Sequence, residues 1–173
     1  MVLGGCALLP SGQELPPVPP LLSPASLGGT HAVTQVLHVA HGDSLFTLQC
    51  AVQADPGAVI LIALGPLGQR AFTLHYDGDK LESQVSPFAP SSLPPERVLS
   101  DVQLAMWPLS SWQEKLKGTE WSVVEPGPGV RKLLFRQDLV SRVDYEGVDP
   151  WRAHIHLQNY VLGYSIDIEP QNP

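Results

Sequence analysis

Apolar and polar residues alternate with a period of two along much of the chain from His31 onwards. The alternation covers residues 33–39 and residues 46–52, and turn sequences at residues 41–43 and 55–57 bound the second segment. A period of two places successive side chains on opposite faces of a strand, so it predicts a β-strand with one buried face. Two neighbouring strands are therefore expected here, with glycine-containing turns on either side of the second.

A continuous apolar run at residues 58–64 follows, which suits a strand that is buried on both faces. Gly65-Pro66-Leu67-Gly68 interrupts the run. Alternation then resumes at residues 72–76 and 81–85, and Asp77-Gly78 between them is a hairpin signal. Later in the chain the strand pattern returns, with candidates at residues 121–124, 131–135, 139–145, 154–159 and 161–168.

Helical periodicity is confined to the middle of the chain. Pro94-Pro95-Glu96 can start a helix because proline fits its first turn. A stripe with helical spacing follows, made of Val98, Leu99, Val102, Ala105 and Met106. Ser111 and Glu114 have the spacing of a capping box, which predicts a second short helix that ends at Lys117-Gly118. Strands, a helical pair and further strands predict a mainly β fold of the α+β class, in which helices pack on one face of an antiparallel sheet.

Composition narrows the classes of function. The chain has 173 residues, which fits one domain, and its formal net charge is −7 without any run of Lys and Arg. Nucleic acids select clustered positive charge, so we expect no nucleic-acid partner. Hydrophobic residues make up 43% and charged residues 16%, which favours strands and loops over surface helices. Cys50 lies in an alternating segment and is interpreted as a small buried hydrophobe.

The first residues resemble a lipoprotein processing site. Leu3-Gly4-Gly5-Cys6 matches the lipobox at which bacterial signal peptidases cut and a lipid is attached to the cysteine. We interpret residues 1–6 as the remnant of a signal peptide that ends in the lipid-attachment site Cys6. Residues 7–27 are rich in proline and are expected to form an extended tether, followed by the folded domain at residues 28–170. The alternatives are a chance Gly-Gly-Cys sequence and a proline-rich ligand for a recognition domain.

No constellation of residues points to catalysis. The sequence lacks the motifs of serine hydrolases, zinc peptidases, phosphate-binding loops and dinucleotide-binding folds. His154 and His156 share a strand face, but two ligands do not complete a zinc site. Residues 41–44 combine His, Asp and Ser within one turn, where a catalytic triad cannot form. We therefore expect no enzyme, no metal and no cofactor, and interpret the histidines as a solvated polar face.

The chain resembles a bacterial family over about residues 25–169. The resemblance is carried by four stretches: Pro66 to Arg70, Phe72 to Gly78, Arg97 to Leu109, and Tyr145 to Trp151. They are similar to an uncharacterised family of predicted lipoproteins that is often encoded in aryl-polyene biosynthesis clusters. More distantly, the order of elements and the Pro-Leu-Gly sequence resemble the outer-membrane lipoprotein receptor of the Lol sorting pathway. This resemblance implies a half-barrel, a curved antiparallel sheet with a two-helix plug.

The resemblance also implies a hydrophobic or acylated ligand. In the sorting receptor the leucine of Pro-Leu-Gly protrudes and passes acylated cargo into the membrane, a role that falls here on the loop Pro66, Leu67 and Gly68. The candidate ligand cavity is lined by Phe46, Leu48, Phe72, Leu74, Leu99, Met106, Trp107 and Phe135. The alternative is that Leu67 folds back and that the other residues simply fill the core.

Two functions remain open from the sequence. The first is a lipoprotein, anchored at the periplasmic face of the outer membrane, that binds or transfers a lipid, lipoprotein acyl chains or a polyene lipid, with a periplasmic carrier protein as a candidate partner. Ala7 after Cys6 favours the outer membrane over the inner one. The second is a non-catalytic adaptor or scaffold in envelope or pigment-assembly machinery. A cavity on the order of several hundred cubic ångströms would favour the first, and a filled interior the second.

Overall fold

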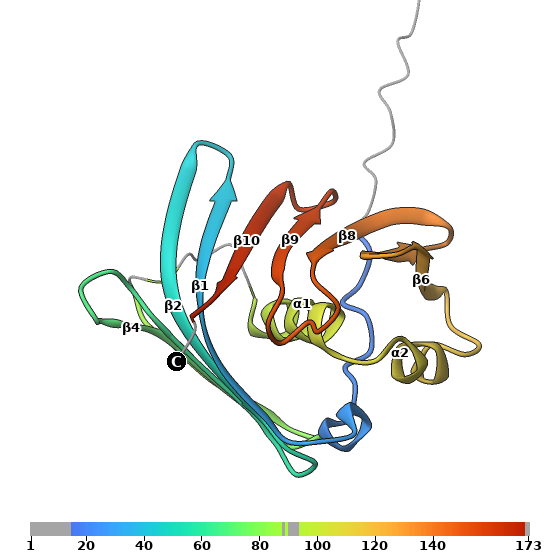
Figure 1. Ribbon diagram of the computed structural model, residues 1–173, viewed down its shortest axis with the longest axis horizontal. Helices are drawn as coiled ribbons and strands as arrows, with labels where there is room; N and C mark the ends of the chain where they lie inside the picture. The colour runs from blue at the N-terminus through green and yellow to red at the C-terminus, as the bar shows by residue number, and fades with distance from the viewer. Residues whose placement is uncertain (1–14, 88, 90–93, 172–173) are drawn as a thin grey trace, which may run out of the picture.

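The computed structural model describes residues 15–87, 89 and 94–171 of the chain. Within them, ten strands form one antiparallel sheet in the order β5-β4-β3-β2-β1-β10-β9-β8-β7-β6 (Figure 1). The strands are β1 (His31–His41), β2 (Ser44–Ala54), β3 (Val59–Leu64), β4 (Arg70–Tyr76), β5 (Leu81–Val85), β6 (Trp121–Gly127), β7 (Val130–Phe135), β8 (Asp138–Glu146), β9 (His154–Asn159) and β10 (Tyr164–Pro170). Because the edge strands β5 and β6 do not pair with each other, the sheet is open. The curved antiparallel sheet predicted from the sequence is confirmed.

Neighbouring strands within each half of the sheet are consecutive in the chain, and the pairing of β1 with β10 joins the halves. His41 lies opposite Tyr164 and Gln35 lies opposite Pro170, so the first and last strands are adjacent at the centre of the sheet. The turn between β7 and β8 consists of Arg136 and Gln137, with φ values of 50° and 75°. Positive φ at both positions is typical of two-residue hairpin turns that match the twist of their strands.

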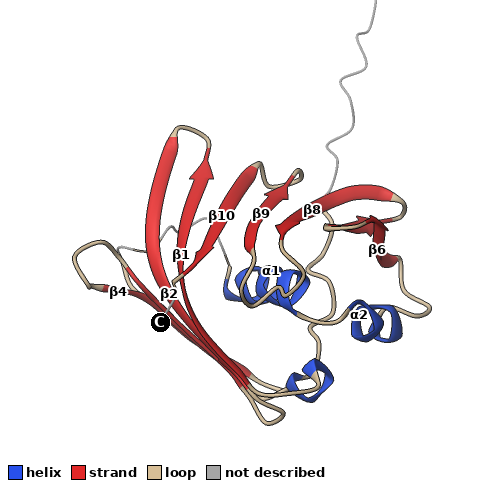
Figure 2. Ribbon diagram, in the orientation of Figure 1, coloured by secondary structure: helices blue, strands red, loops and turns tan. Residues whose placement is uncertain are grey.

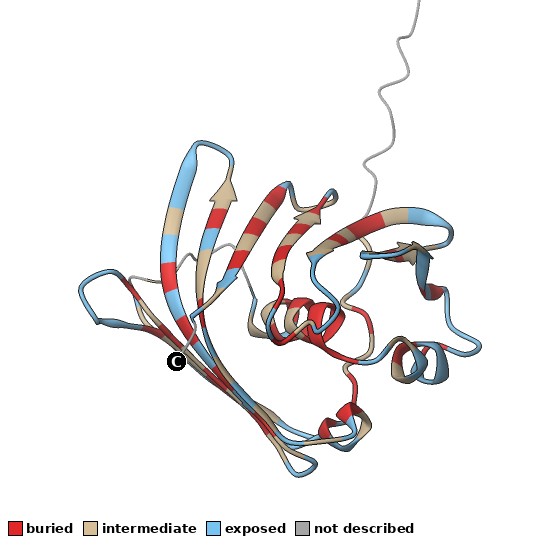
Figure 3. Cartoon of the chain, viewed as in Figure 1, coloured by how far each residue is buried: buried red, intermediate tan, exposed pale blue. Residues whose placement is uncertain are grey.

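Burial alternates along the strands, as the period of two predicted (Figure 3). β3 differs from its prediction. Val59, Leu61 and Ala63 are buried, whereas the residues between them are only partly buried. The expectation of a strand buried on both faces is wrong, because the helices cover one face of the sheet and the other face borders solvent.

Two helices, α1 (Pro95–Met106) and α2 (Leu109–Lys115), form the predicted plug. α1 lies inside the curve of the sheet, and α2 lies near β6 (Figure 2). The predicted capping box is wrong, since α2 follows Pro108 without a side-chain cap. Ser111 lies inside α2, and its hydroxyl donates instead to the carbonyl oxygen of Ser26 at 2.7 Å. Among the described residues, no helix combines the length and apolarity needed to cross a bilayer.

Part of the proline-rich segment belongs to the folded domain. Leu22 is 1% exposed, and the side chain of Gln103 in α1 bonds both its backbone N–H and its carbonyl oxygen, at 2.8 and 2.7 Å. The short 3-10 helix η1 (Pro24–Leu27) buries two further apolar side chains. The tether expected over residues 7–27 therefore ends before Leu22, because the Leu22 side chain is buried in the core and its backbone is bonded to Gln103 of α1. Cys6 and the tether as far as residue 14 lie outside the described residues.

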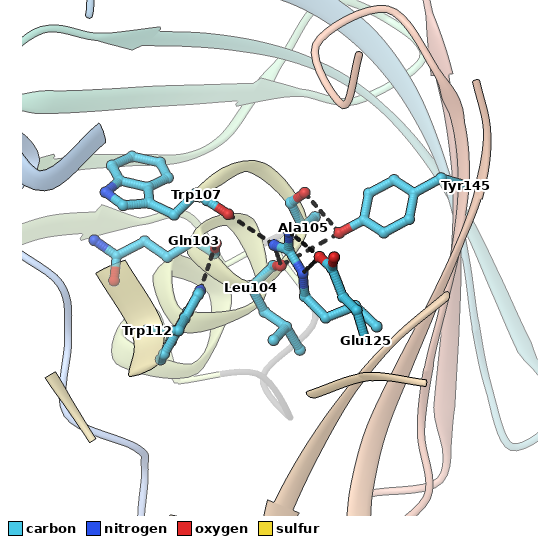
Figure 4. A network of polar contacts seen from close by, with 8 residues as sticks. Gln103, Leu104, Ala105, Trp107, Trp112, Glu125 and Tyr145 are labelled. Carbon is cyan, nitrogen blue, oxygen red and sulfur yellow. Dashed lines mark hydrogen bonds and ion pairs between the residues drawn. The ribbon is translucent and has the colours of Figure 1, made fainter. Parts of the chain in front are cut away.

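Side chains from the sheet fix the C-terminal end of α1 (Figure 4). The last carbonyl groups of a helix have no donor within the helix. Arg131 of β7 donates to the carbonyl oxygens of Leu104 and Trp107 at 2.6 and 2.8 Å, and Tyr145 of β8 donates to that of Ala105 at 2.8 Å. The positive charge of Arg131 also complements the negative end of the helix dipole. These contacts set the position of α1 relative to the sheet.

Candidate functional site

An apolar cavity lies between α1 and the concave face of the sheet. Inward-facing residues of β1 to β4, β9 and β10 form one wall, and Val98, Val102 and Met106 of α1 form much of the other. The cavity has a volume of about 70 Å³, enough for roughly five groups the size of a water molecule. Val85 of β5, which also lines it, is 52% exposed and marks its open side. The volume is below the roughly 300–1,000 Å³ of most ligand pockets, so side chains fill much of the expected hollow.

The residues predicted to line a ligand cavity divide into two groups. Those that line the observed cavity are Leu48, Phe72, Leu74 and Met106. Leu99 and Trp107 have no exposed surface and belong to the filled core. Phe46 is partly buried and packs against that core. Phe135 lies at β7, where its ring centroid is 4.8 Å from that of Trp121. Apolar patterning identified buried positions but did not separate the cavity wall from the core.

Two polar side chains reach this otherwise apolar lining, Gln35 of β1 and Asp101 of α1. Gln35 is 2% exposed, and its Nε2 has no hydrogen-bond partner among the described residues. The other buried glutamine, Gln103, is fully buried and uses both of its side-chain polar atoms on Leu22. Buried donors in folded proteins are nearly always bonded. The Gln35 amide is therefore an unusual group in an apolar cavity.

Asp101 is at one end of a buried polar chain. The hydroxyl of Tyr164 in β10 donates to Asp101 Oδ2, and Asn159 Nδ2 donates to the Tyr164 hydroxyl at 3.2 Å. Burial raises the pKa of Asp101 from 3.8 to about 7, although the hydrogen bond from Tyr164 and the positive charge of Arg97 both act to lower it. Burial and the adjacent Asp101 raise the pKa of Tyr164. The Asp101 carboxyl therefore keeps its proton to a higher pH than an exposed aspartate does.

Cys50 supplies apolar surface to the cavity and no nucleophile. Its side chain is 2% exposed, and burial raises the pKa of the thiol to about 12. A thiol with this pKa stays protonated at neutral pH, and the thiolate is the reactive form. The interpretation of Cys50 as a small buried hydrophobe is confirmed.

The loop between β3 and β4 presents Leu67 to solvent. Leu67 is 92% exposed, so the alternative that it folds back into the core is wrong. Gln69 braces the turn, because its Oε1 accepts the Leu67 N–H at 3.0 Å and its carbonyl oxygen accepts the Gly65 N–H at 2.8 Å. A Cβ at Gly65 would collide with the Gln69 side chain, and Gly68 has a φ of 75°, so both glycines suit this turn. Pro66 is exposed beside Leu67.

A wider hollow of about 1040 Å³ lies beside β1 to β3 and the β8–β9 loop. Thr34, Gln53 and Arg152 are among its lining residues, together with His31 and Trp151, whose rings stack at 4.5 Å. Polar side chains and solvent-facing strand positions make up much of this surface. It is more open than the cavity under α1, and polar side chains make up a larger share of its lining, although Ile60 and Ile62 also contribute apolar surface.

The two candidate histidines face carboxylates on neighbouring strands. His156 Nδ1 lies 2.7 Å from Asp167 Oδ1, and His154 Nδ1 lies 3.4 Å from Glu146 Oε2. In the part of the chain that the structure describes, no group of three or more His, Cys, Asp or Glu residues could hold a metal ion. The four side chains are between 40% and 81% exposed, but the Nε2 atom of His154 is buried without a hydrogen-bond partner among the described residues, so the interpretation of a solvated polar face holds only in part.

Neither polar group of the cavity was predicted as a site residue. The sequence did carry a signal for both. Gln35 occupies an inward position of the alternating segment at residues 33–39, and Asp101 lies three residues after Val98 on the cavity side of α1. A polar residue in an otherwise apolar series is the observation that could have identified them.

Comparison with known proteins identifies the family of the chain but not its function. No curated protein matches the chain. The family match extends over residues 32–172, which includes nearly the whole sheet and both helices of the plug. The chain therefore belongs to DUF3261, a family of proteins of unknown function.

Proposed function

We propose that the protein binds the apolar part of a hydrophobic or acylated ligand between α1 and the concave face of the sheet. The observation that carries the proposal is the cavity itself, whose lining is apolar apart from Gln35 and Asp101. Apolar surface that leaves water gains about 25 cal/mol per Å², so such a wall favours hydrocarbon. The candidate ligands are those expected from the sequence: a lipid, the acyl chains of a lipoprotein, or a polyene lipid.

The size of the cavity limits how such a ligand is held. The cavity of about 70 Å³ takes only the first few groups of a bound molecule. The remainder extends towards the open side at Val85, past the partly exposed Val98 and Val102. The proposed complex is thus a ligand held at one end, with its chain partly covered by α1.

Leu67 is the proposed contact with the membrane. It is an exposed apolar side chain at the tip of a hydrogen-bonded turn, and its transfer into lipid is worth about 1.5–3 kcal/mol. The proposal includes a lipid on Cys6 that anchors the domain at the periplasmic face of the outer membrane, with a periplasmic carrier protein as partner. The lipobox sequence and the resemblance to predicted lipoproteins support this part.

A non-catalytic adaptor or scaffold is the second candidate. The observation that favours it is the small volume of the cavity, since large side chains such as Trp107 and Trp112 fill the neighbouring core completely. An adaptor has no apolar ligand, and its partners contact its exposed surface. Ligand binding therefore separates the two functions.

The test is a titration of the delipidated protein with N-phenyl-1-naphthylamine, an uncharged fluorophore that brightens in apolar surroundings. Val98→Trp fills the open side of the cavity, and Val124→Trp places the same side chain at a 40% exposed position of edge strand β6. We expect the wild type and Val124→Trp to bind the fluorophore and Val98→Trp to bind it at least about tenfold more weakly, a difference of about 1.4 kcal/mol. Absence of binding by the wild type, or equal binding by all three, would contradict the proposal and favour the adaptor.

A further inference from the structure

Gln35 lies where a ligand in the cavity would meet it. It is in the central strand β1, opposite Cys50 of β2 and Pro170 of β10, and its side chain is 2% exposed. The carboxamide lines the cavity, and its Nε2 has no partner among the described residues. The backbone groups of the neighbouring strands are hydrogen-bonded within the sheet. The Gln35 amide is therefore available to donate a hydrogen bond to a ligand in the cavity.

The surroundings of this amide restrict the chemistry of that ligand. The described lining has one other polar side chain, Asp101, whose Oδ2 already accepts the hydrogen bond from Tyr164. The described lining of the cavity contains no cationic side chain that could pair with an anionic ligand. Asp101 is itself negatively charged above its pKa of about 7 and would then repel an anion. Burial of an unpaired charge is strongly unfavourable. A neutral hydrogen-bond acceptor fits the amide, and a carboxylate does not.

We propose that Gln35 recognises the uncharged carbonyl group of an acyl ester or acyl amide, with its Nε2 donating a hydrogen bond to the carbonyl oxygen while the apolar wall holds the acyl chain. This inference rests on the proposed function and specifies its substrate class. Acyl chains linked through an ester or amide are selected, and free fatty acids and plain hydrocarbons are not. Gln35 is then the group that determines specificity.

The experiment displaces N-phenyl-1-naphthylamine with three probes of similar length: methyl decanoate, decanoate and undecane. Gln35→Met removes the amide and keeps an unbranched side chain of similar size. Gln49→Met, at an exposed position of β2, is the matched control. We expect Gln35→Met to weaken binding of methyl decanoate by roughly tenfold, the contribution of one buried hydrogen bond, and to leave binding of undecane unchanged. The wild type should prefer methyl decanoate to decanoate, and Gln49→Met should behave as the wild type does.

The outcomes separate this inference from the function on which it rests. If the wild type binds the fluorophore but Gln35→Met weakens methyl decanoate and undecane equally, or neither, then Gln35 does not recognise the carbonyl. Tighter binding of decanoate than of its methyl ester would also overturn the inference. If the wild type binds neither the fluorophore nor any probe, the proposed function fails together with it.

Discussion

Two buried glutamines in this fold should respond in opposite ways to the same substitution. Gln103 bonds the backbone N–H and carbonyl oxygen of Leu22, which is itself 1% exposed. Gln35 is buried to a similar extent, but its Nε2 has no partner among the described residues. Methionine resembles glutamine in length and shape and has no strong donor or acceptor. Gln103→Met and Gln35→Met therefore compare a satisfied and an unsatisfied amide directly.

The expected magnitudes follow from the groups left behind. Gln103→Met leaves two buried backbone groups of Leu22 unbonded, and each unsatisfied group costs about 1–3 kcal/mol, so the free energy of unfolding should fall by about 2–6 kcal/mol. Gln35→Met removes a buried donor that has no partner. The free energy of unfolding should therefore rise, by about 1–2 kcal/mol. In a domain of this size that gain raises Tm by about 2–8 °C.

Urea unfolding followed by tryptophan fluorescence measures both changes, and equal m-values for the three proteins would show that the unfolded states are comparable. The stabilisation by Gln35→Met is the informative result, because a residue kept at the expense of stability is retained for a function. A loss of more than about 1 kcal/mol in Gln35→Met would refute the reasoning, since it would mean that the amide contributes to the fold.

Three further predictions concern the loop, the acid and the helix. Leu67→Glu should leave the melting temperature nearly unchanged, because exposed positions contribute within about 0.5 kcal/mol, yet it should abolish transfer of bound ligand to liposomes. Val148→Glu, fully exposed in the β8–β9 loop at the opposite end of the sheet, is its control, and normal transfer by Leu67→Glu would remove Leu67 from the mechanism. The raised pKa of Asp101 means that the folded state keeps a proton that the unfolded chain has released. The free energy of unfolding should therefore fall as the pH rises from about 4 to about 7, by up to about 1.4 kcal/mol per pH unit. Asp101→Asn should flatten this decline in urea titrations, and an unchanged slope would contradict the raised pKa of Asp101. Leu99→Ala and Met106→Ala should each lower the free energy of unfolding by about 2–5 kcal/mol, and unchanged urea midpoints would show that these side chains are not core.

The strands were predictable because an antiparallel sheet with helices on one face enforces a period of two. The same reasoning explains the error at residues 58–64, where every residue is apolar although alternate side chains are only partly buried. An apolar side chain is tolerated at a partly exposed position of a strand, so Ile60 and Ile62 cost little stability there. Burial alternates with a period of two along β3, although apolar and polar residues do not alternate in its sequence.

Contacts between distant parts of the chain were not predictable. Ser111 has the correct spacing for a capping box, but its hydroxyl donates a hydrogen bond to the carbonyl oxygen of Ser26, 85 residues away. The proline-rich segment is expected from the sequence to extend freely, whereas burial of Leu22 and its hydrogen bonds to Gln103 hold it against α1. The sequence marks Gln35 and Asp101 as polar residues at inward positions, but only the fold shows that β1 and α1 bring them to the same cavity. Such long-range contacts decide which of the inward-facing polar side chains find a hydrogen-bond partner.

Native mass spectrometry of the delipidated protein after exposure to a membrane extract detects a bound ligand without a probe. We expect the wild type and Val124→Trp to retain a small hydrophobic molecule that contains an acyl ester or amide, and Val98→Trp, with the cavity filled, to lose it. Release of the bound molecule by tandem fragmentation would identify the acyl linkage. A wild-type protein that retains no molecule, or one that Val98→Trp retains equally, would contradict a ligand site between α1 and the sheet.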